Sequence, residues 1–171
     1  MEELKSAIRD ILDFPKPGII FKDITTLLNQ KDKFKKTIDQ FAEHYKEKQI
    51  DYIVGVESRG FIIGAALSYV LGAGFVPIRK KGKLPAETIQ EDYELEYGTD
   101  TLEIHKDAIP ENANVLIVDD LLATGGTLEA VAKLVEKLNA NIVSIGCIIE
   151  LSFLNGRDKL KAYDIFSLIT Y

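Results

Sequence analysis

The chain has 171 residues, of which 46% are hydrophobic and 28% charged, with a formal net charge of −6. This length suits a single domain, residues 1–171, with a substantial core. The acidic balance disfavours a general binder of polyanions, so we expect no nucleic-acid partner. No apolar run is long enough to span a membrane, and Cys147 is the only cysteine, which excludes an intramolecular disulfide. We therefore expect a cytoplasmic protein without a membrane partner.

The amino-terminal part of the chain predicts two helices separated by irregular segments. Apolar residues recur at helical spacing from Leu4 to Leu12, and this predicted helix ends at the Pro- and Gly-bearing residues 13–18. Residues 19–24 form a short apolar segment, and residues 25–28 are predicted to begin another turn. Apolar residues at helical spacing between Phe34 and Tyr45 predict the second helix.

A buried strand is predicted at residues 51–56, followed by a polar turn, Glu57 to Gly60, and an apolar helix over residues 61–71. Backbone donors in such a turn can bind a phosphate, and Arg59 adds a planar fork of donors. The alternative is that Arg59 is a surface charge paired with Glu57.

The middle of the chain is polar and lacks helical periodicity. A short strand at residues 75–78 runs into a basic segment, Arg79 to Lys83. Residues 87–95 and 101–104 then form two possible extended segments, with a tight turn at Gly98. We interpret residues 79–105, approximately, as a lid over the sheet, although a solvated hairpin without a function would have the same pattern.

The most informative stretch is VLIVDDLLATGGT, residues 115–127. Residues 115–118 predict a buried parallel strand that Asp119 and Asp120 end, and apolar residues at helical spacing from Leu128 to Leu138 predict a helix. The small-residue turn between them therefore opens a helix. Its backbone N–H groups and the positive end of the helix dipole favour a bound phosphate.

The two acids before this turn cannot bind a phosphate, but they can accept hydrogen bonds from the hydroxyl groups of a sugar. The turn is neither a Walker A loop nor a dinucleotide fingerprint, because the required spacings are missing. The alternative is an ordinary strand, turn and helix whose acids are merely polar caps. With further strands predicted at residues 141–149 and 165–169, the chain is expected to have an α/β fold whose mainly parallel sheet binds ligands beyond the carboxyl ends of its strands.

Residues 115–127 resemble the phosphoribosyl pyrophosphate signature of the type I phosphoribosyltransferases. Almost the whole chain resembles the adenine phosphoribosyltransferases of that family. The matching segments are PGIIFKDI (17–24), ESRGF (57–61), IRKKGKLP (78–85), LEYG (95–98) and IELSFLNGRDKL (149–160). The resemblance implies a type I phosphoribosyltransferase fold, with helices flanking a mainly parallel sheet and a flexible lid. It also implies transfer of a phosphoribosyl group from magnesium-bound phosphoribosyl pyrophosphate to adenine, giving AMP and pyrophosphate in purine salvage, by a homodimer.

The resemblance also implies roles for individual residues. Asp119 and Asp120 would hold the ribose hydroxyls, and the 5′-phosphate would be bound by Ala123, Thr124, Gly125, Gly126 and Thr127. Pyrophosphate would be bound by Glu57, Ser58, Arg59, Arg79, Lys80 and Lys83, with a cis peptide bond after Glu57. Adenine would be bound by Phe21, Lys22 and Leu151, with help from approximately residues 1–30. Glu96 would act as general base and Arg59 would stabilise the leaving group. Magnesium (Mg2+) would be held mainly by the substrate, with Asp119 as the candidate protein contact.

Two alternatives remain at this level. A related enzyme could use hypoxanthine, guanine or xanthine, but such a site would be expected to place a donor such as Lys against the 6-oxo group, where this chain has Leu151 to Phe153. A regulator with the same fold could sense phosphoribosyl pyrophosphate without catalysis, but Glu96 in a retained lid favours an enzyme. Cys147 is predicted to be a core residue, and His44 and His105 have no partners that indicate a metal site or catalysis.

Overall fold

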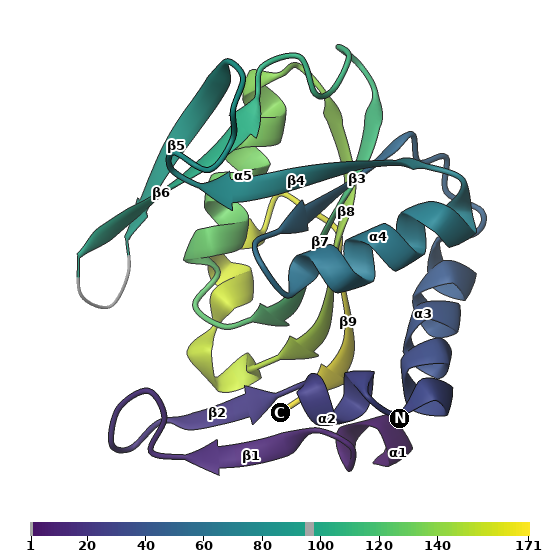
Figure 1. The fold of residues 1–171 in the computed structure, drawn as a ribbon, viewed down its shortest axis with the longest axis vertical. Helices are drawn as coiled ribbons and strands as arrows, with labels where there is room; N and C mark the ends of the chain where they lie inside the picture. The colour runs from purple at the N-terminus through teal and green to yellow at the C-terminus, as the bar shows by residue number, and fades with distance from the viewer. Residues whose placement is uncertain (1, 95–97) are drawn as a thin grey trace.

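A seven-stranded sheet forms the centre of the computed structural model, which describes residues 2–94 and 98–171 (Figure 1). The strand order is β5-β6-β4-β3-β7-β8-β9. The strands from β4 to β9 in this order run parallel, whereas β6 pairs antiparallel with both β4 and β5. The prediction of an α/β fold with a mainly parallel sheet is therefore confirmed.

The helices and strands have the following bounds. The helices are α1 (Glu2–Lys5), α2 (Thr25–Leu28), α3 (Lys31–Tyr45), α4 (Gly60–Leu71) and α5 (Gly126–Lys137), with two short 3-10 helices, η1 (Ser152–Leu154) and η2 (Gly156–Leu160). The strands are β1 (Arg9–Leu12), β2 (Ile20–Asp23), β3 (Tyr52–Val56), β4 (Gly74–Lys80), β5 (Thr88–Glu94), β6 (Thr99–His105), β7 (Asn114–Leu122), β8 (Asn141–Glu150) and β9 (Ile165–Thr170).

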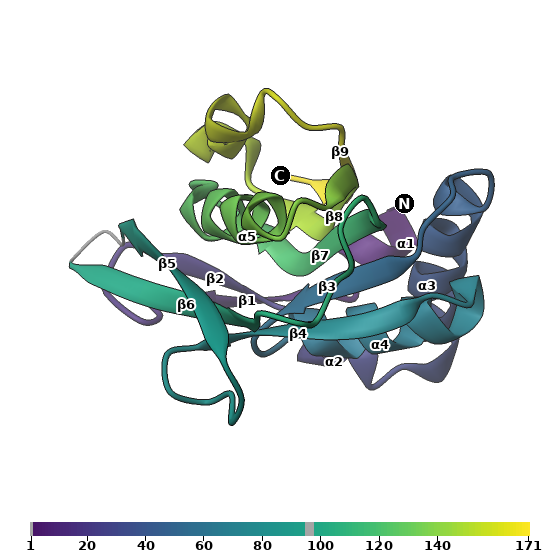
Figure 2. The ribbon, with the colours of Figure 1, turned by 90° about the horizontal axis from the view of Figure 1, so that it is seen from above.

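Helices cover both faces of the sheet, with α5 on one side and α3 and α4 on the other (Figure 2). Successive side chains of a strand point to opposite faces, so the run Val115 to Val118 supplies both cores. Val115 and Ile117 pack with α5, whereas Leu116 and Val118 pack with α3 and α4. All four are fully buried. This explains why β7 reads as a continuous apolar run rather than an alternating one.

The prediction of a helix from Leu4 to Leu12 is wrong beyond its first turn. Helix α1 ends at Lys5, and residues 9–12 form β1, which pairs antiparallel with β2. Ion pairs across this hairpin, including Arg9 with Asp23 at 2.5 Å, compete with helix formation. Leu12 consequently points into solvent and is 69% exposed. The turn predicted at residues 25–28 is instead the single helical turn α2.

The hairpin of β1 and β2 lies beside the carboxyl ends of the parallel strands (Figure 1). Lys22 of β2 holds the hairpin near the end of the chain, because its ammonium lies 3.9 Å from the centre of the Tyr171 ring. In α1, just before the hairpin, the Lys5 ammonium donates to the Thr170 carbonyl at 2.8 Å. The two extended segments predicted around Gly98 are β5 and β6. Among the described residues, no helix is long and apolar enough to cross a membrane.

Candidate functional site

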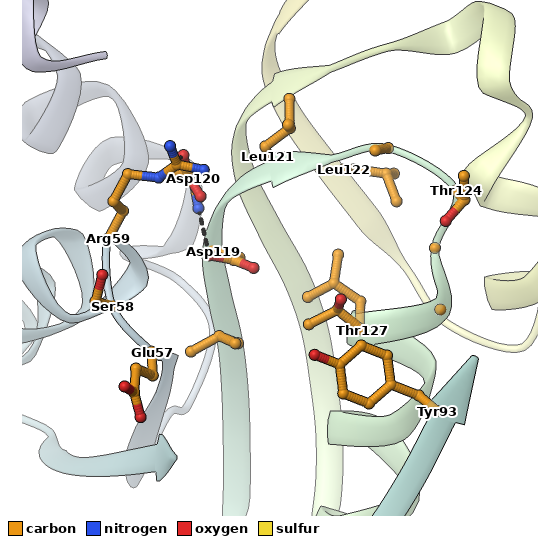
Figure 3. Close-up of a pocket in the computed structure, with 15 residues that line it drawn as sticks. Glu57, Ser58, Arg59, Tyr93, Asp119, Asp120, Leu121, Leu122, Thr124 and Thr127 are labelled. Carbon is orange, nitrogen blue, oxygen red and sulfur yellow. Dashed lines mark hydrogen bonds and ion pairs between the residues drawn. The ribbon is translucent and has the colours of Figure 1, made fainter. Parts of the chain in front are cut away.

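A pocket lies at the carboxyl ends of β3 and β7, and Figure 3 shows its lining. Residues 56–59, Tyr93 and residues 119–128 line it. Two segments far apart in the sequence, residues 56–59 and 119–128, therefore meet there, as the adjacency of β3 and β7 requires. The structure brings together all the residues predicted from these two turns, Glu57 to Arg59, both acids and the loop from Ala123 to Thr127.

The loop from Ala123 to Thr127 forms the amino end of α5, as predicted. Gly125 has φ +83°, a conformation that favours glycine, and α5 begins at Gly126. A side chain on Gly125 would also overlap the Gly156 carbonyl oxygen, so the loop packs directly against η2. The free N–H groups at the start of α5 and the helix dipole can bind one phosphate.

The two acids lie inside β7 and not after it, which corrects the prediction that they end the strand. Pairing with β8 continues as far as Leu122, opposite Glu150, so the strand remains regular past the acids. The Asp120 side chain is buried, and the Asp120 N–H donates to the Asp119 carboxylate at 2.8 Å. Burial raises the pKa of Asp119 well above its ordinary value, and repulsion from Asp120 raises it further. Hydroxyl donors or cations that approach the two carboxylates therefore stabilise their charged forms.

Arg59 pairs with Asp120 and not with Glu57, so the proposed surface pair with Glu57 is wrong. The Arg59 Nε lies 2.7 Å from Asp120 Oδ2. Burial raises the pKa of Asp120, although Arg59 partly offsets this effect. The Arg59 guanidinium also lies 5.0 Å from the centre of the Phe21 ring. Arg59 thus contacts both a candidate ribose ligand and a candidate base-stacking residue.

The basic segment lies beside the pocket but does not line it. Arg79, Lys80 and Lys83 are absent from the pocket lining, and each pairs with a carboxylate. Arg79 and Lys83 pair with Glu57, and Lys80 pairs with Asp100 at 2.9 Å. The peptide bond between Glu57 and Ser58 is cis, as the resemblance implied.

An apolar cavity adjoins this pocket. Its lining comprises Gly18, Ile19, Ile20, Lys22, Thr124, Leu151, Phe153, Leu154 and Tyr171. Thr124 lines both cavities, so the phosphate loop separates a polar space from an apolar one. Of the three residues predicted to bind adenine, Lys22 and Leu151 line this cavity. Phe21 does not line the apolar cavity; its half-buried ring packs edge to face with Phe14, with 5.3 Å between ring centres.

Sequence reasoning missed several lining residues. Tyr93 extends from β5 into the polar pocket, where its hydroxyl faces Thr127 (Figure 3). The alternation of Ile89, Glu91 and Tyr93 along β5 places these three on one face of the strand and could have identified Tyr93 as inward-facing. Tyr171 reaches the apolar cavity only through the pairing of β9, which sequence periodicity does not predict.

The remaining candidates lie outside the site or outside the described residues. Glu96, the predicted general base, lies outside the described residues 2–94 and 98–171. Cys147 is buried in the middle of β8, as predicted, and burial raises the pKa of its thiol. The His44 ring stacks on Phe166, with 3.9 Å between ring centres.

Within the described ranges, no group of three or more His, Cys, Asp or Glu side chains could hold a metal ion. Asp119 and Asp120 supply two neighbouring carboxylates. This donor set fits magnesium, which commonly uses one or two carboxylates and completes its shell with phosphate oxygens of a substrate and with water.

Comparison with known proteins supports this description. A family model described as "Phosphoribosyl transferase domain" matches residues 23–170. The adenine phosphoribosyltransferase of Acaryochloris marina is 62% identical over 169 residues, covering 99% of each chain. The crystal structure of adenine phosphoribosyltransferase from Thermoanaerobacter pseudethanolicus is 57% identical, covers 99% of each chain and has a TM-score of 0.97. The Saccharomyces cerevisiae enzyme, complexed with an imino-altritol bisphosphate and adenine, is 48% identical, with a TM-score of 0.93 and coverage of 98% of this chain and 97% of that one.

Proposed function

Because this chain belongs to the phosphoribosyltransferase family, we propose that its two adjoining cavities bind phosphoribosyl pyrophosphate and adenine. The chain is a pentosyltransferase. It transfers the 5-phosphoribosyl group from phosphoribosyl pyrophosphate to adenine and gives AMP and pyrophosphate, a reaction of purine salvage.

One observation carries the assignment of the cavities. Thr124 lines both the polar pocket and the apolar cavity, so a sugar phosphate and a flat base bound on either side of it would meet at the loop. Their adjacency brings a base nitrogen and C1′ of ribose together, and such positioning removes much of the entropic barrier of a two-substrate reaction.

The polar pocket has suitable donors and acceptors for phosphoribosyl pyrophosphate. The N–H groups at the start of α5, with the hydroxyls of Thr124 and Thr127, bind the 5′-phosphate. Asp119 and Asp120 accept hydrogen bonds from the ribose hydroxyls, which offsets the mutual repulsion of the two carboxylates. Magnesium would contact Asp119 and substrate oxygens, and when bound it neutralises charge on the pyrophosphate.

Departure of pyrophosphate leaves positive charge on the ribose ring and negative charge on the leaving group. Arg59, Ser58 and the basic segment beside the pocket stabilise the leaving charge. The Arg59 guanidinium, which pairs with Asp120 in the structure, must then also contact a phosphate oxygen. Its five N–H donors allow both contacts at once.

The apolar cavity suits adenine. Leu151 lines this cavity and supplies one face for the base, and Phe21, whose half-buried ring lies outside the lining, is proposed as the second face of a sandwich. Within the described part of the chain, strand β2 pairs with β1 alone, so the backbone groups on its other edge are available to read the edge of the base near Ile20 and Lys22. From the sequence resemblance alone, Glu96 accepts the proton that adenine loses.

We also propose a homodimer in the cytoplasm that uses magnesium-bound substrate, because the family resemblance implies all three. The activity is tested by measuring pyrophosphate release from the purified chain. We expect release only when adenine, phosphoribosyl pyrophosphate and magnesium are all present. Release that does not depend on adenine, or no release at all from folded protein, would contradict the proposal.

A further inference from the structure

The basic segment from Arg79 to Lys83, here called the basic turn, has a defined conformation. It begins with the last two residues of β4, Arg79 and Lys80, and is closed by a hydrogen bond from the Lys83 N–H to the Lys80 carbonyl at 3.3 Å. Gly82 has φ +79°, and its N–H donates to Glu103 at 2.9 Å. The turn therefore presents its cations in a fixed arrangement beside the pocket.

Glu57 connects this turn to the pocket. Its side chain is only 10% exposed, and it accepts hydrogen bonds from the Lys83 ammonium, from Arg79 Nε at 3.3 Å and from the Lys80 N–H at 3.0 Å. The Glu57 N–H donates in turn to the Ile78 carbonyl at 3.0 Å. Among the described residues that line the polar pocket, Glu57 is the one whose side chain pairs with the basic turn.

The Glu57 carboxylate points away from Asp119 (Figure 3). Its ion pairs with Arg79 and Lys83 place it against the basic turn. Burial alone would raise the pKa of Glu57, but the hydrogen bonds from Lys83 and from the Lys80 N–H outweigh it, and the pKa is lowered. Glu57 is thus an anion at neutral pH. An anion this close to a pyrophosphate site is tolerated only if its charge is neutralised, and here two cations neutralise it.

The cations retain donors after pairing with Glu57. A lysine ammonium has three N–H donors and an arginine guanidinium has five. Lys83 donates to Glu57, while Arg79 donates to Glu57 through Nε and to the Lys83 carbonyl through Nη1. The other N–H groups of both side chains are available to a phosphate, and the cluster of Glu57, Arg79 and Lys83 still carries one positive charge.

We propose that Glu57 is a positioning residue, whose carboxylate holds Arg79 and Lys83 so that their remaining donors bind the pyrophosphate group of phosphoribosyl pyrophosphate. This inference rests on the proposed function of the polar pocket. It assigns the Glu57 side chain to the protein's own cations rather than to the substrate. In the opposite role, Glu57 would compete with the substrate for the two cations. That role predicts that removing the Glu57 charge strengthens the binding of phosphoribosyl pyrophosphate.

The test is Glu57→Gln, which keeps the size of the side chain and removes its charge. We expect the KM for phosphoribosyl pyrophosphate to rise by about fivefold to tenfold, and inhibition by added pyrophosphate to weaken by a similar factor, because tenfold corresponds to about 1.4 kcal/mol, the range of one charge-assisted contact. The KM for adenine should stay within about twofold, whereas kcat should fall, because the same two cations also stabilise the charge of the leaving pyrophosphate. An unchanged or lower KM for phosphoribosyl pyrophosphate would overturn the positioning role.

A second variant shows whether Glu57 acts through the two cations. In an Arg79→Met, Lys83→Met background, Glu57→Gln should change the KM for phosphoribosyl pyrophosphate by less than about twofold, because nothing remains for Glu57 to position. The same fivefold to tenfold change in this background would refute the inference. Asp164→Asn is the matched control, since Asp164 pairs with Lys48 at 2.7 Å before the amino end of β9, and it should leave every constant unchanged.

Thermal unfolding separates a folding defect from a positioning defect, because all these variants are expected to melt within a few degrees of the wild type. Failure of the proposed function would be visible first, as a wild-type chain that forms no AMP. A wild-type chain that is active beside a Glu57→Gln chain with unaltered constants would remove only the role of Glu57.

Discussion

Asp119 illustrates how a residue that suits a ligand can destabilise the free protein. Its pKa is raised by burial and by Asp120, so the folded state binds this proton more readily than the unfolded state. Stability therefore falls as pH rises from the ordinary pKa of an aspartate through the raised pKa of the folded state. At neutral pH the free energy of unfolding is therefore lower than it is at acid pH, as far as this carboxyl group contributes.

We accordingly predict that Asp119→Asn melts at a higher temperature than the wild type at pH 7, by roughly 2–4 °C for each 1 kcal/mol recovered. The variant should nevertheless bind phosphoribosyl pyrophosphate at least about tenfold more weakly, because a charged acceptor for the ribose hydroxyls is lost. The measurements are thermal unfolding from pH 4 to 8 and calorimetric titration. The gain in melting temperature should shrink as pH falls toward 4. Unchanged affinity in a folded variant would instead support the view of the acids as polar caps.

Phe21 is the second residue whose role can be decided by substitution. Phe21→Ala removes one candidate stacking face, worth about 0.5–1.5 kcal/mol, so the KM for adenine should rise by about twofold to tenfold. The KM for phosphoribosyl pyrophosphate should change much less. Steady-state kinetics with each substrate varied in turn decides the matter. If the protein lost stability while both constants stayed the same, the ring that contacts Phe14 would be a packing residue and the base would lie elsewhere.

Most of the polar pocket could be predicted from the sequence because its residues are consecutive in two motifs. Their proximity follows from the rule that parallel strands place their carboxyl ends at one edge of the sheet, which brings together residues 57–59 and 119–127. Partners of charged residues could not be predicted in this way. Arg59 has Glu57 two residues away in the sequence, yet it pairs with Asp120 across the sheet edge. Such choices depend on the register of neighbouring strands.

At the scale of elements, the phosphate loop and η2 contact each other through two glycines. A side chain on Gly156 would overlap the Ala123 carbonyl oxygen, and one on Gly125 would overlap the Gly156 carbonyl. The Leu151 N–H also donates to the Leu122 carbonyl at 2.9 Å. The segment that lines the apolar cavity therefore sets the position of the phosphate loop.

From this contact we predict that Gly156→Ala raises the KM for phosphoribosyl pyrophosphate by at least about tenfold, because displacement of a binding loop by even 1 Å can lower activity about a hundredfold. Gly74→Ala is the control, since its added methyl meets the Tyr52 ring and, at 3.7 Å, the Asp51 carbonyl oxygen, near the amino ends of β3 and β4 and away from the pocket. Kinetics and melting curves of both variants check the prediction. A Gly156→Ala chain with lower stability but wild-type KM values would mean that the contact serves only packing.

The elements themselves were predictable where periodicity was long and unopposed, as in α3, α4 and α5. The prediction failed at Leu4 to Leu12, where apolar spacing matched a helix but pairing with β2 prevailed. It also ended β7 too early, because charged side chains are usually a sign of a strand's end. Here Asp119 and Asp120 stay in the strand because β8 continues to pair with it. Both predictions failed because strand pairing between segments distant in the sequence decides the structure there, and the local order of apolar and polar residues does not reveal such pairing.

At the scale of the whole molecule, the outer face of α4 bears on the proposed homodimer. This helix carries no charged residue, and three apolar side chains that share one face are exposed, Ile62 at 44%, Tyr69 at 90% and Val70 at 51%. A helix that is apolar all round is normally covered on all sides. In the proposed homodimer, a second copy of the chain would cover this face of α4.

We predict that sedimentation at micromolar concentration finds a dimer, and that Tyr69→Glu shifts it toward monomer, because two carboxylates would be buried at a symmetric interface. Lys35→Gln, on the exposed side of α3, is a control with the same charge change of −1 per chain and should leave the assembly intact. A wild-type monomer would contradict the homodimer, and a dimer unaffected by Tyr69→Glu would place its interface away from α4.

The central claim is that the polar pocket and the apolar cavity together join a phosphoribosyl group to adenine. The most direct measurement is a competition in which the chain, phosphoribosyl pyrophosphate and magnesium are incubated with equal amounts of adenine, hypoxanthine and guanine, and the nucleotides are identified by mass spectrometry. We predict AMP as the dominant product, because residues 151–154 contribute only the apolar side chains of Leu151, Phe153 and Leu154 to the cavity lining. Lys22 also lines the cavity, but its ammonium is paired with Asp10 at 2.7 Å. Predominance of IMP or GMP, or no nucleotide from folded protein that binds phosphoribosyl pyrophosphate, would contradict it.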